Sequence, residues 1–295
     1  MRKFIVLFVL GLIVATPKVS LAAYARDYLP LPAGYTLFAA YFNHVSANNY
    51  YVNDNKVTDS FNKSLNLGLL RLVHYVNIGD ALYGDGGFTV DPQFIIPFVD
   101  LELSGDYIGG TDFSTSGMGD PMILATFWFV NDPQNKFWIG FTPWVTVPIG
   151  RYDKNRMASP GGNRWVIKPE LGIVKGFGDK TYLDIIFGEE FYTDNDEYLG
   201  DSELEQDPTF QLEAHLSYDI TKTWSVSLDY FFIAGGETKV DGVDQDNEMK
   251  NHGVGLTSFF MIGDHHQLLF SYRDDFSVET GWGDKTFGAR WCYFF

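Results

Sequence analysis

The sequence predicts an all-β protein: a transmembrane antiparallel β-barrel of twelve strands, closed between its first and last strand. Three observations predict this fold. About a dozen runs of roughly ten residues alternate apolar and polar side chains, as a membrane-spanning strand requires. The connections between them are alternately long and short, and the chain ends on an alternating strand whose last residue is Phe295. Ten or fourteen strands are the alternatives.

The composition fits an exported membrane barrel better than a periplasmic enzyme. The 295 residues carry a formal net charge of −17, with 17% aromatic residues and 30 glycines. Such acidity argues against nucleic acid as a partner, because phosphate binding relies on Lys and Arg. The single cysteine, Cys292, excludes an intrachain disulfide. We expect the protein in the bacterial outer membrane.

The N-terminus has the features of a secretory signal peptide, which we place over residues 1–22. Arg2 and Lys3 precede an apolar run of about twelve residues, shorter than the roughly 20 of a transmembrane helix, and Ala22 ends a plausible cleavage site. Residues 23–295 are then one exported barrel domain. Its first part, 25–33, contains two prolines, so we expect an extended periplasmic lead-in to the first strand.

The strand-like runs follow one another through the rest of the chain. Alternation is strictest in 209–219, where Leu212 and Leu216 flank Glu213 and His215. Because successive side chains of a strand point to opposite faces, one face of this run meets lipid and the other the lumen. The second and third runs alternate less cleanly, which predicts a bulge in each. The twelve runs lie near 35–44, 65–76, 88–99, 119–130, 137–148, 164–175, 181–191, 209–219, 224–233, 252–262, 267–275 and 286–295.

The connections support the same fold independently. Those after even-numbered runs are short turns such as NDPQN at 131–135 and GFGDK at 176–180. Tight turns on the periplasmic side and long loops outside are the layout of outer-membrane barrels, and an even strand count places both ends in the periplasm. The long loops lie near 45–64, 100–118, 149–163, 192–208, 234–251 and 276–285.

The last run, 286–295, has apolar residues at every second position back from the C-terminus, among them Trp291 and Tyr293. This pattern resembles the C-terminal signal that the barrel-assembly machinery of the outer membrane reads, so we expect Phe287–Phe295 to contact that machinery. The other expected partners are outer-membrane lipid and lipopolysaccharide. An edge strand of a soluble sandwich is the alternative for this run taken alone.

The polar faces of the strands also carry charges and aromatic rings, which we expect to line the lumen. Such charges must be paired or hydrated, so they form either a plug of salt bridges or a hydrated path that filters solutes. The aromatic rings suit the passage of ring-shaped, weakly polar compounds, or simply fill a narrow barrel. The candidate lumen-lining residues are Trp138, Trp144, Lys168, Glu170, Glu213, His215, Asp229, Phe231, Arg273 and Arg290.

No pattern in the sequence predicts a metal site, a cofactor or an enzyme. The loop 192–208 has seven acidic residues and no Lys or Arg, but its spacing does not match an EF-hand. It either stays solvated or binds divalent cations. Ser217 stands two positions from His215, as a lipid hydrolase could use, yet such pairs are common by chance.

Several stretches together resemble one known family, described as "Putative MetA-pathway of phenol degradation", whose members are outer-membrane transporter-like proteins of Gram-negative bacteria. The resemblance covers nearly all of the mature chain and implies a hydrophobic or aromatic solute, but it carries over no site residue. It rests on DYLPLPAGYTLFAAYFNHVSANNYY (27–51), GMGDPMILATFWFVNDP (117–133), GFTPWVTVPIGRYDKNR (140–156), NRW (163–165), LGIVKGFGDK (171–180), QDPTFQLEAHLSYDIT (206–221) and GGETKVDGVDQDN (235–247).

The expected function is passive uptake of small hydrophobic or aromatic solutes across the outer membrane. Solutes would bind at the acidic, aromatic outer loops and diffuse along a narrow lumen lined by the alternating polar positions. The alternative is a structural or surface-interaction barrel with a plugged lumen and cation-binding acidic loops. A lipid hydrolase of the outer membrane comes third.

Overall fold

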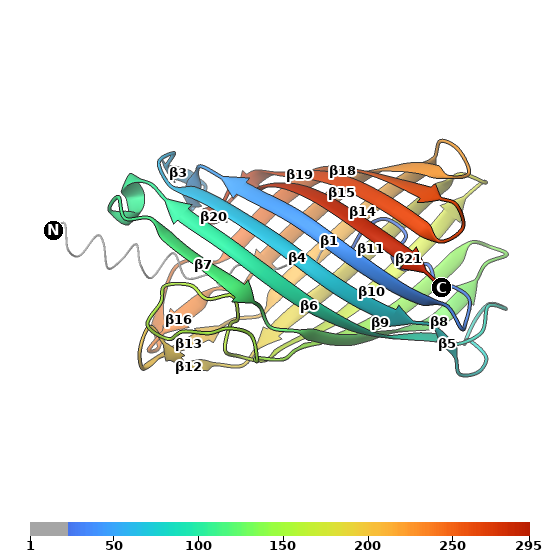
Figure 1. The fold of residues 1–295 in the computed structure, drawn as a ribbon, viewed down its shortest axis with the longest axis horizontal. Helices are drawn as coiled ribbons and strands as arrows, with labels where there is room; N and C mark the ends of the chain where they lie inside the picture. The colour runs from blue at the N-terminus through green and yellow to red at the C-terminus, as the bar shows by residue number, and fades with distance from the viewer. Residues whose placement is uncertain (1–22) are drawn as a thin grey trace.

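The computed structural model describes residues 23–295, so the signal peptide predicted over 1–22 lies outside the described residues. The chain forms one closed antiparallel barrel of twelve long strands (Figure 1). This confirms the predicted fold and strand number, and each predicted run corresponds to one strand. The strands are β1 (Thr36–Ala47), β4 (Asn62–His74), β6 (Thr89–Ser104), β8 (Met122–Asp132), β9 (Phe137–Thr146), β10 (Val166–Phe177), β11 (Thr181–Tyr192), β14 (Thr209–Asp219), β15 (Trp224–Gly235), β18 (Met249–Ile262), β19 (His266–Val278) and β21 (Lys285–Phe294).

The barrel closes between its first and last strand, as predicted. β1 pairs with β21 over ten residues, from Leu37 opposite Phe294 to Ser46 opposite Lys285. Beyond the last pair, Thr36 and Phe295 exchange two backbone hydrogen bonds of 2.7 and 2.9 Å. Closure satisfies the backbone donors and acceptors that an open sheet edge would expose to lipid.

Deletion of Phe295 should reduce the amount of assembled barrel. The deletion removes both backbone hydrogen bonds to Thr36, worth about 2 kcal/mol together, and the terminal ring. The heat-modifiable fraction of the protein in cell envelopes, measured on gels, should fall relative to the Phe276→Ala control, which alters an exposed phenylalanine away from the closure. Equal fractions for both variants would show that the terminal residue has no part in assembly.

The outer surface of the barrel is apolar. Leu216, Leu228 and Leu256 lie on the neighbouring strands β14, β15 and β18, and each is at least half exposed. Their alternation with buried polar residues is typical of a wall that faces lipid outside and a polar interior inside. Among residues 23–295, no helix is long and apolar enough to cross a membrane.

The long connections gather at the end of the barrel opposite the C-terminus (Figure 1). They form two small sheets there, and β7 extends the wall by pairing with the outer half of β6. Long loops at one end and short turns at the other confirm the predicted layout. The additional elements are β2 (Tyr50–Val52), β3 (Asn55–Thr58), β5 (Val76–Asn77), a 3-10 helix (Asp106–Ile108), β7 (Phe113–Met118), β12 (Asn195–Tyr198), β13 (Ser202–Gln206), β16 (Thr238–Val240), β17 (Val243–Asp244) and β20 (Gly281–Trp282).

The bulges predicted for the second and third strands are absent where these strands pair with each other. β4 and β6 pair residue for residue from Asn62 opposite Ser104 to Val73 opposite Gln93, so that prediction is wrong. The alternation of apolar and polar residues is unclear in β4 and β6 because much of their lumen-facing side is itself apolar. Two register shifts in the barrel wall occur elsewhere, between β8 and β9 and between β18 and β19.

Candidate functional site in the barrel lumen

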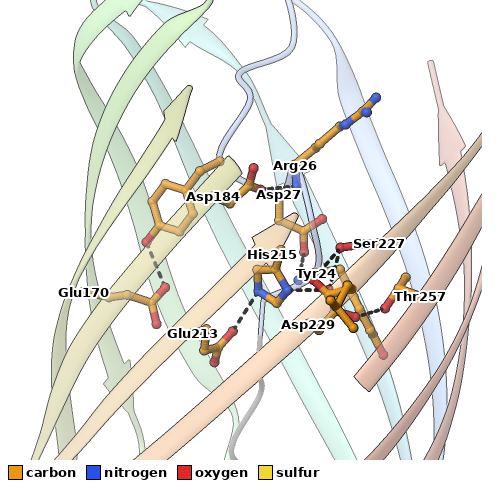
Figure 2. A network of polar contacts seen from close by, with 12 residues as sticks. Tyr24, Arg26, Asp27, Glu170, Asp184, Glu213, His215, Ser227, Asp229 and Thr257 are labelled. Carbon is orange, nitrogen blue, oxygen red and sulfur yellow. Dashed lines mark hydrogen bonds and ion pairs between the residues drawn. The ribbon is translucent and has the colours of Figure 1, made fainter. Parts of the chain in front are cut away.

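The described residues that precede the first strand, from residue 23 on, enter the inside of the barrel. Arg26 forms an ion pair of 2.7 Å with Asp219, and its Nε donates to Ser217 Oγ at 2.9 Å. The backbone N–H of Arg26 donates to the carboxylate of Asp184 (Figure 2). We call residues 23–33 the plug segment. The prediction of a periplasmic lead-in is wrong, because this segment brings polar side chains that match groups of the inner wall.

The next residue of the plug segment is tied to a different part of the wall. Asp27 accepts two hydrogen bonds, of 2.8 and 3.0 Å, from Nη1 of Arg290 on β21. Arg290 is itself 7% exposed and also donates to Gln267 of β19 at 2.8 Å. Arg26 and Asp27 thus link β14 to β21, which three other strands separate in the sheet, and the segment bridges the lumen rather than following one wall.

Tyr28 anchors the plug segment to a third part of the wall. Its side chain is 4% exposed, and its hydroxyl donates to Glu170 Oε1 at 2.8 Å. The same hydroxyl lies 2.8 Å from Thr142 Oγ1. The backbone carbonyl of Tyr28 accepts a hydrogen bond of 2.9 Å from the indole of Trp128. Contacts with β8, β9 and β10 therefore fix both the ring and the backbone of this residue.

One side of the lumen carries a buried polar group centred on His215. The imidazole Nδ1 lies 2.8 Å from Asp229 Oδ1, and Nε2 lies 3.4 Å from Glu213 Oε2 in an ion-pair contact. Asp229 also accepts hydrogen bonds of 2.6 Å from Ser227 and from Thr257. The group joins β14, β15 and β18, and Figure 2 shows it together with the plug segment. The imidazole thus lies between two buried carboxyl groups.

A second polar group lies beside Tyr28. Lys168 and Glu170, both 5% exposed, form an ion pair of 2.7 Å on β10. The Lys168 Nζ lies 4.4 Å from the ring centroid of Trp144, whose indole N–H donates to Glu170 at 3.3 Å. The lysine and the indole thus hold the Glu170 carboxylate in position against the tyrosine hydroxyl.

The opposite side of the lumen is apolar along the outer halves of β4 and β6. The prediction that polar residues line the lumen is wrong for this part of the two strands, where alternation separates two apolar faces, one toward lipid and one toward the barrel interior. The apolar inward residues, each at most 5% exposed, are Leu65, Leu67, Leu69, Ile95, Val99, Leu101 and Leu103. Farther along the same inward faces, Arg71 donates a hydrogen bond of 2.8 Å to Gln93, which is 5% exposed.

The remaining candidate residues are distributed along the inner wall. Trp138 is buried and donates from its indole N–H to Asn131 at 3.1 Å. Phe231, 9% exposed, packs below the guanidinium of Arg273, whose carbon lies 4.4 Å from the ring centroid. Arg273 pairs with Asp275 at 2.7 Å and is the least buried of the ten candidates. Of the ten candidates, Glu170 and Arg290 bind the plug segment directly, through Tyr28 and Asp27.

A pocket beside the plug segment is lined by Tyr28, Arg71 and Trp144, among other residues. Because the plug segment contacts several parts of the inner wall, a solute that crosses the lumen has to move past this segment.

The acidic outer loops contain no cluster of three or more metal-ligating side chains within residues 23–295. Some of their acidic residues pair with lysines instead: Lys154 with Asp201 at 2.9 Å, and Lys239 with Asp244 at 3.3 Å. The hydrogen bond to Asp201 raises the pKa of Lys154 above its usual value. The loops are thus partly neutralised within the protein.

Sequence reasoning missed the plug segment, whose key residues are Tyr24, Arg26, Asp27 and Tyr28. A short segment without period-two alternation cannot be placed in the lumen from a strand pattern. The available signal was chemical: Arg, Asp and Tyr stand directly next to each other just before a proline-containing stretch. Each of them complements a charge or a carboxylate on an inward strand position.

Comparison with known proteins places the chain among membrane channels. The sequence profile of the family described as "Putative MetA-pathway of phenol degradation" matches residues 47–291. No curated protein matches the chain significantly. The COG4313 outer membrane channel from Pseudomonas putida F1 is 28% identical, with a TM-score of 0.86, over 93% of this chain and 100% of that one. The closed barrel and this similarity support an outer-membrane location.

Two autotransporter barrels share the fold alone. The transport unit of AIDA-I from Escherichia coli has a TM-score of 0.56 at 9% identity, covering 99% of this chain and 97% of its own. The β domain of Bordetella BrkA has a TM-score of 0.53 at 8% identity, covering 89% and 100%. Likeness at such identities carries no information about solutes.

Proposed function

The chain belongs to the family described as "Putative MetA-pathway of phenol degradation", and on this premise we propose that it serves passive uptake of small hydrophobic or aromatic solutes. The similarity to an outer membrane channel supports passage across the membrane rather than catalysis. Its partners would be outer-membrane lipid around the apolar wall, lipopolysaccharide at the acidic loops, the assembly machinery at Phe287–Phe295, and the solute.

The observation that carries this proposal is the two-sided lumen. Leucines of β4 and branched residues of β6 face charged groups of β10, β14 and β15 across the plug segment. A wide aqueous pore would have water against polar walls on all sides, whereas an apolar wall gives a hydrophobic solute a surface to slide along. Solutes with an apolar body therefore fit this interior better than ions or sugars.

A solute would pass when the plug segment gives up its contacts with the wall, rather than through a permanently open pore. Hydrogen bonds and ion pairs hold the plug segment through Arg26, Asp27 and Tyr28. Water and displaced wall groups can replace such contacts in a lumen at modest cost, so the segment can leave without unfolding the barrel. The barrel wall itself, closed by backbone hydrogen bonds, stays intact throughout.

Trp144→Ala tests whether the lumen is the solute route. The ring is 8% exposed between the apolar wall and Glu170, so its loss widens the interior next to Tyr28. We expect cells carrying the variant to take up the hydrophobic dye N-phenylnaphthylamine several-fold faster than cells with the unchanged protein, at equal amounts of folded barrel. Trp291→Ala on the lipid face is the matched control. Identical rates for all three proteins would argue against a route past this residue.

A structural or surface-interaction barrel is the second candidate, and the filled lumen favours it. In that case the plug segment stabilises the barrel permanently, and the acidic outer loops provide the function. Deletion of residues 194–205 separates the candidates: loss of a divalent-cation response with unchanged dye uptake would support the surface function.

The third candidate, a lipid hydrolase, lacks the required geometry among the described residues. Nδ1 of His215 faces Asp229, its Nε2 faces Glu213, and Ser217 accepts a hydrogen bond from Arg26 instead. A serine nucleophile needs its hydroxyl hydrogen-bonded to the histidine base. Replacing Ser217 by Ala should leave lipid turnover in the membrane unchanged.

A further inference from the structure

We propose that the inner wall contains a recognition site for a phenol, which the side chain of Tyr28 occupies in this structure, and that a free phenol competes for it. The inference rests on the proposed function and names the solute class: uncharged phenols with an apolar substituent para to the hydroxyl. Three neighbouring cross-strand pairs of β9 and β10 build the site, one for the ring, one for the hydroxyl and one to support the carboxylate.

The first pair makes a flat slot for the ring. Gly140 of β9 lies directly opposite Gly172 of β10, and both are inward positions. A Cβ added to Gly172 would lie 2.3 Å from ring carbons of Tyr28, and one added to Gly140 would lie 3.1 Å from the ring. Any other residue at 172 would therefore collide with the aromatic ring. Glycine there lets the ring lie against the backbone.

The second pair binds the hydroxyl. Thr142 lies opposite Glu170, two residues along each strand from the glycines and so on the same face. The phenol hydroxyl of Tyr28 donates to Glu170 Oε1 and contacts Thr142 Oγ1, both at 2.8 Å. A hydrogen bond to an ionised carboxylate is roughly twice as strong as one between neutral groups. The site thus requires a hydroxyl donor at this end of the ring.

The third pair orients the acceptor. Lys168 lies opposite Trp144, and both contact the Glu170 carboxylate, at 2.7 and 3.3 Å. These contacts do not involve Tyr28, so the acceptor remains in place when the tyrosine leaves. The site is therefore built into the barrel wall and does not depend on the plug segment for its shape.

The Glu170 acceptor also determines which ligands the site excludes. An aromatic carboxylate or a phenolate would place a negative charge against Glu170, and an unsubstituted hydrocarbon ring would leave the acceptor without a donor. The position para to the hydroxyl is where the Tyr28 side chain joins the backbone, so a methyl group there has room. The simplest matching ligand is p-cresol, the side chain of tyrosine without its backbone.

A tethered ligand competes strongly with a free one. Short tethers give effective concentrations in the millimolar range, so a free phenol must reach about that level to displace Tyr28. Displacement would remove the anchor of the plug segment on β8, β9 and β10. The phenol would thereby loosen the plug, and the solute itself would open its route.

The Tyr28→Ala variant leaves the site empty, and the experiment tests whether p-cresol fills it. In planar bilayers, this variant should conduct more than the unchanged protein, and p-cresol should reduce the added conductance in a concentration-dependent way. Toluene, which has the same ring and methyl group without the hydroxyl, should need at least about tenfold higher concentration, as expected for loss of a charge-assisted hydrogen bond. Tyr28→Phe keeps a ring in the slot but lacks the hydroxyl that donates to Glu170, so p-cresol should displace this ring and raise the conductance at a lower concentration than in the unchanged protein.

Two glycine variants complete the test. Combining Tyr28→Ala with Gly172→Ala should abolish the effect of p-cresol, because the added methyl group occupies the slot. Gly68→Ala, whose added Cβ would meet only ordinary contacts of 3.9 Å, is the matched control and should keep the effect. Equal potency of toluene and p-cresol, or an effect that persists with Gly172→Ala, would overturn the phenol site.

A second readout covers the case in which Tyr28→Ala does not assemble. A spin label on Leu31→Cys in the otherwise unchanged barrel should become more mobile with p-cresol and not with toluene at the same concentration. Equal mobility with both compounds would overturn the proposal.

Dye uptake separates the phenol site from the proposed function of passive uptake. Uptake without p-cresol binding contradicts the phenol site alone, whereas p-cresol binding without uptake supports the site and contradicts passive uptake.

Discussion

Replacing Arg26 and Asp27 together by alanine should release the plug segment and raise the single-channel conductance of the barrel. Arg26 pairs with Asp219, and their side chains are 16% and 24% exposed. Asp27 pairs with Arg290, and their side chains are 18% and 7% exposed. Loss of a fully buried pair costs about 3–5 kcal/mol, and partial exposure reduces this to about 1.5 kcal/mol for each. The released state should then be about a hundredfold more populated.

The control for this prediction removes an ion pair elsewhere. Lys239→Ala with Asp244→Ala breaks a pair of similar type on the hairpin of β16 and β17, outside the lumen. Its conductance should equal that of the unchanged protein. A folded Arg26/Asp27 variant with unchanged conductance would mean that the segment stays in place without these pairs, or that the lumen is closed by other groups.

Replacing His215 by alanine should produce the largest loss of stability among single substitutions in the polar lumen. The imidazole is 1% exposed between Asp229 and Glu213, and its removal leaves two buried carboxyl groups without the ring that lies between them. Truncating one member of such a group costs about 3 kcal/mol or more. The free energy of unfolding, measured by denaturant titration of the barrel in lipid vesicles, should fall by about that amount.

Neutral partners should largely restore the stability of the His215 variant. Adding Glu213→Gln and Asp229→Asn removes the two charges, so the triple variant should be more stable than His215→Ala alone. His74→Ala, at an exposed histidine near the end of β4, should have little effect. A loss for His215→Ala that the neutral partners do not reduce would mean that packing of the ring, rather than charge, is the contribution of His215.

The strand pattern of this chain could be predicted because the barrel wall is governed by a local rule. A residue such as Leu216 faces lipid and its neighbour His215 faces the interior, and the alternation repeats every two residues whatever the rest of the chain does. The same rule located most of the candidate lumen residues. It failed for β4 and β6, since leucines suit both lipid and a packed interior and so conceal which face is which.

The sequence by itself determined the twelve strands and their closure, because both depend on period-two alternation and on short turns between neighbours. Only the tertiary structure decided what fills the interior. The contacts of Arg26 with Asp219 and of Asp27 with Arg290 join residues about 190 and 263 positions apart along the chain. No local pattern encodes such pairs; they exist because closing the barrel encloses the plug segment among charged groups that need partners.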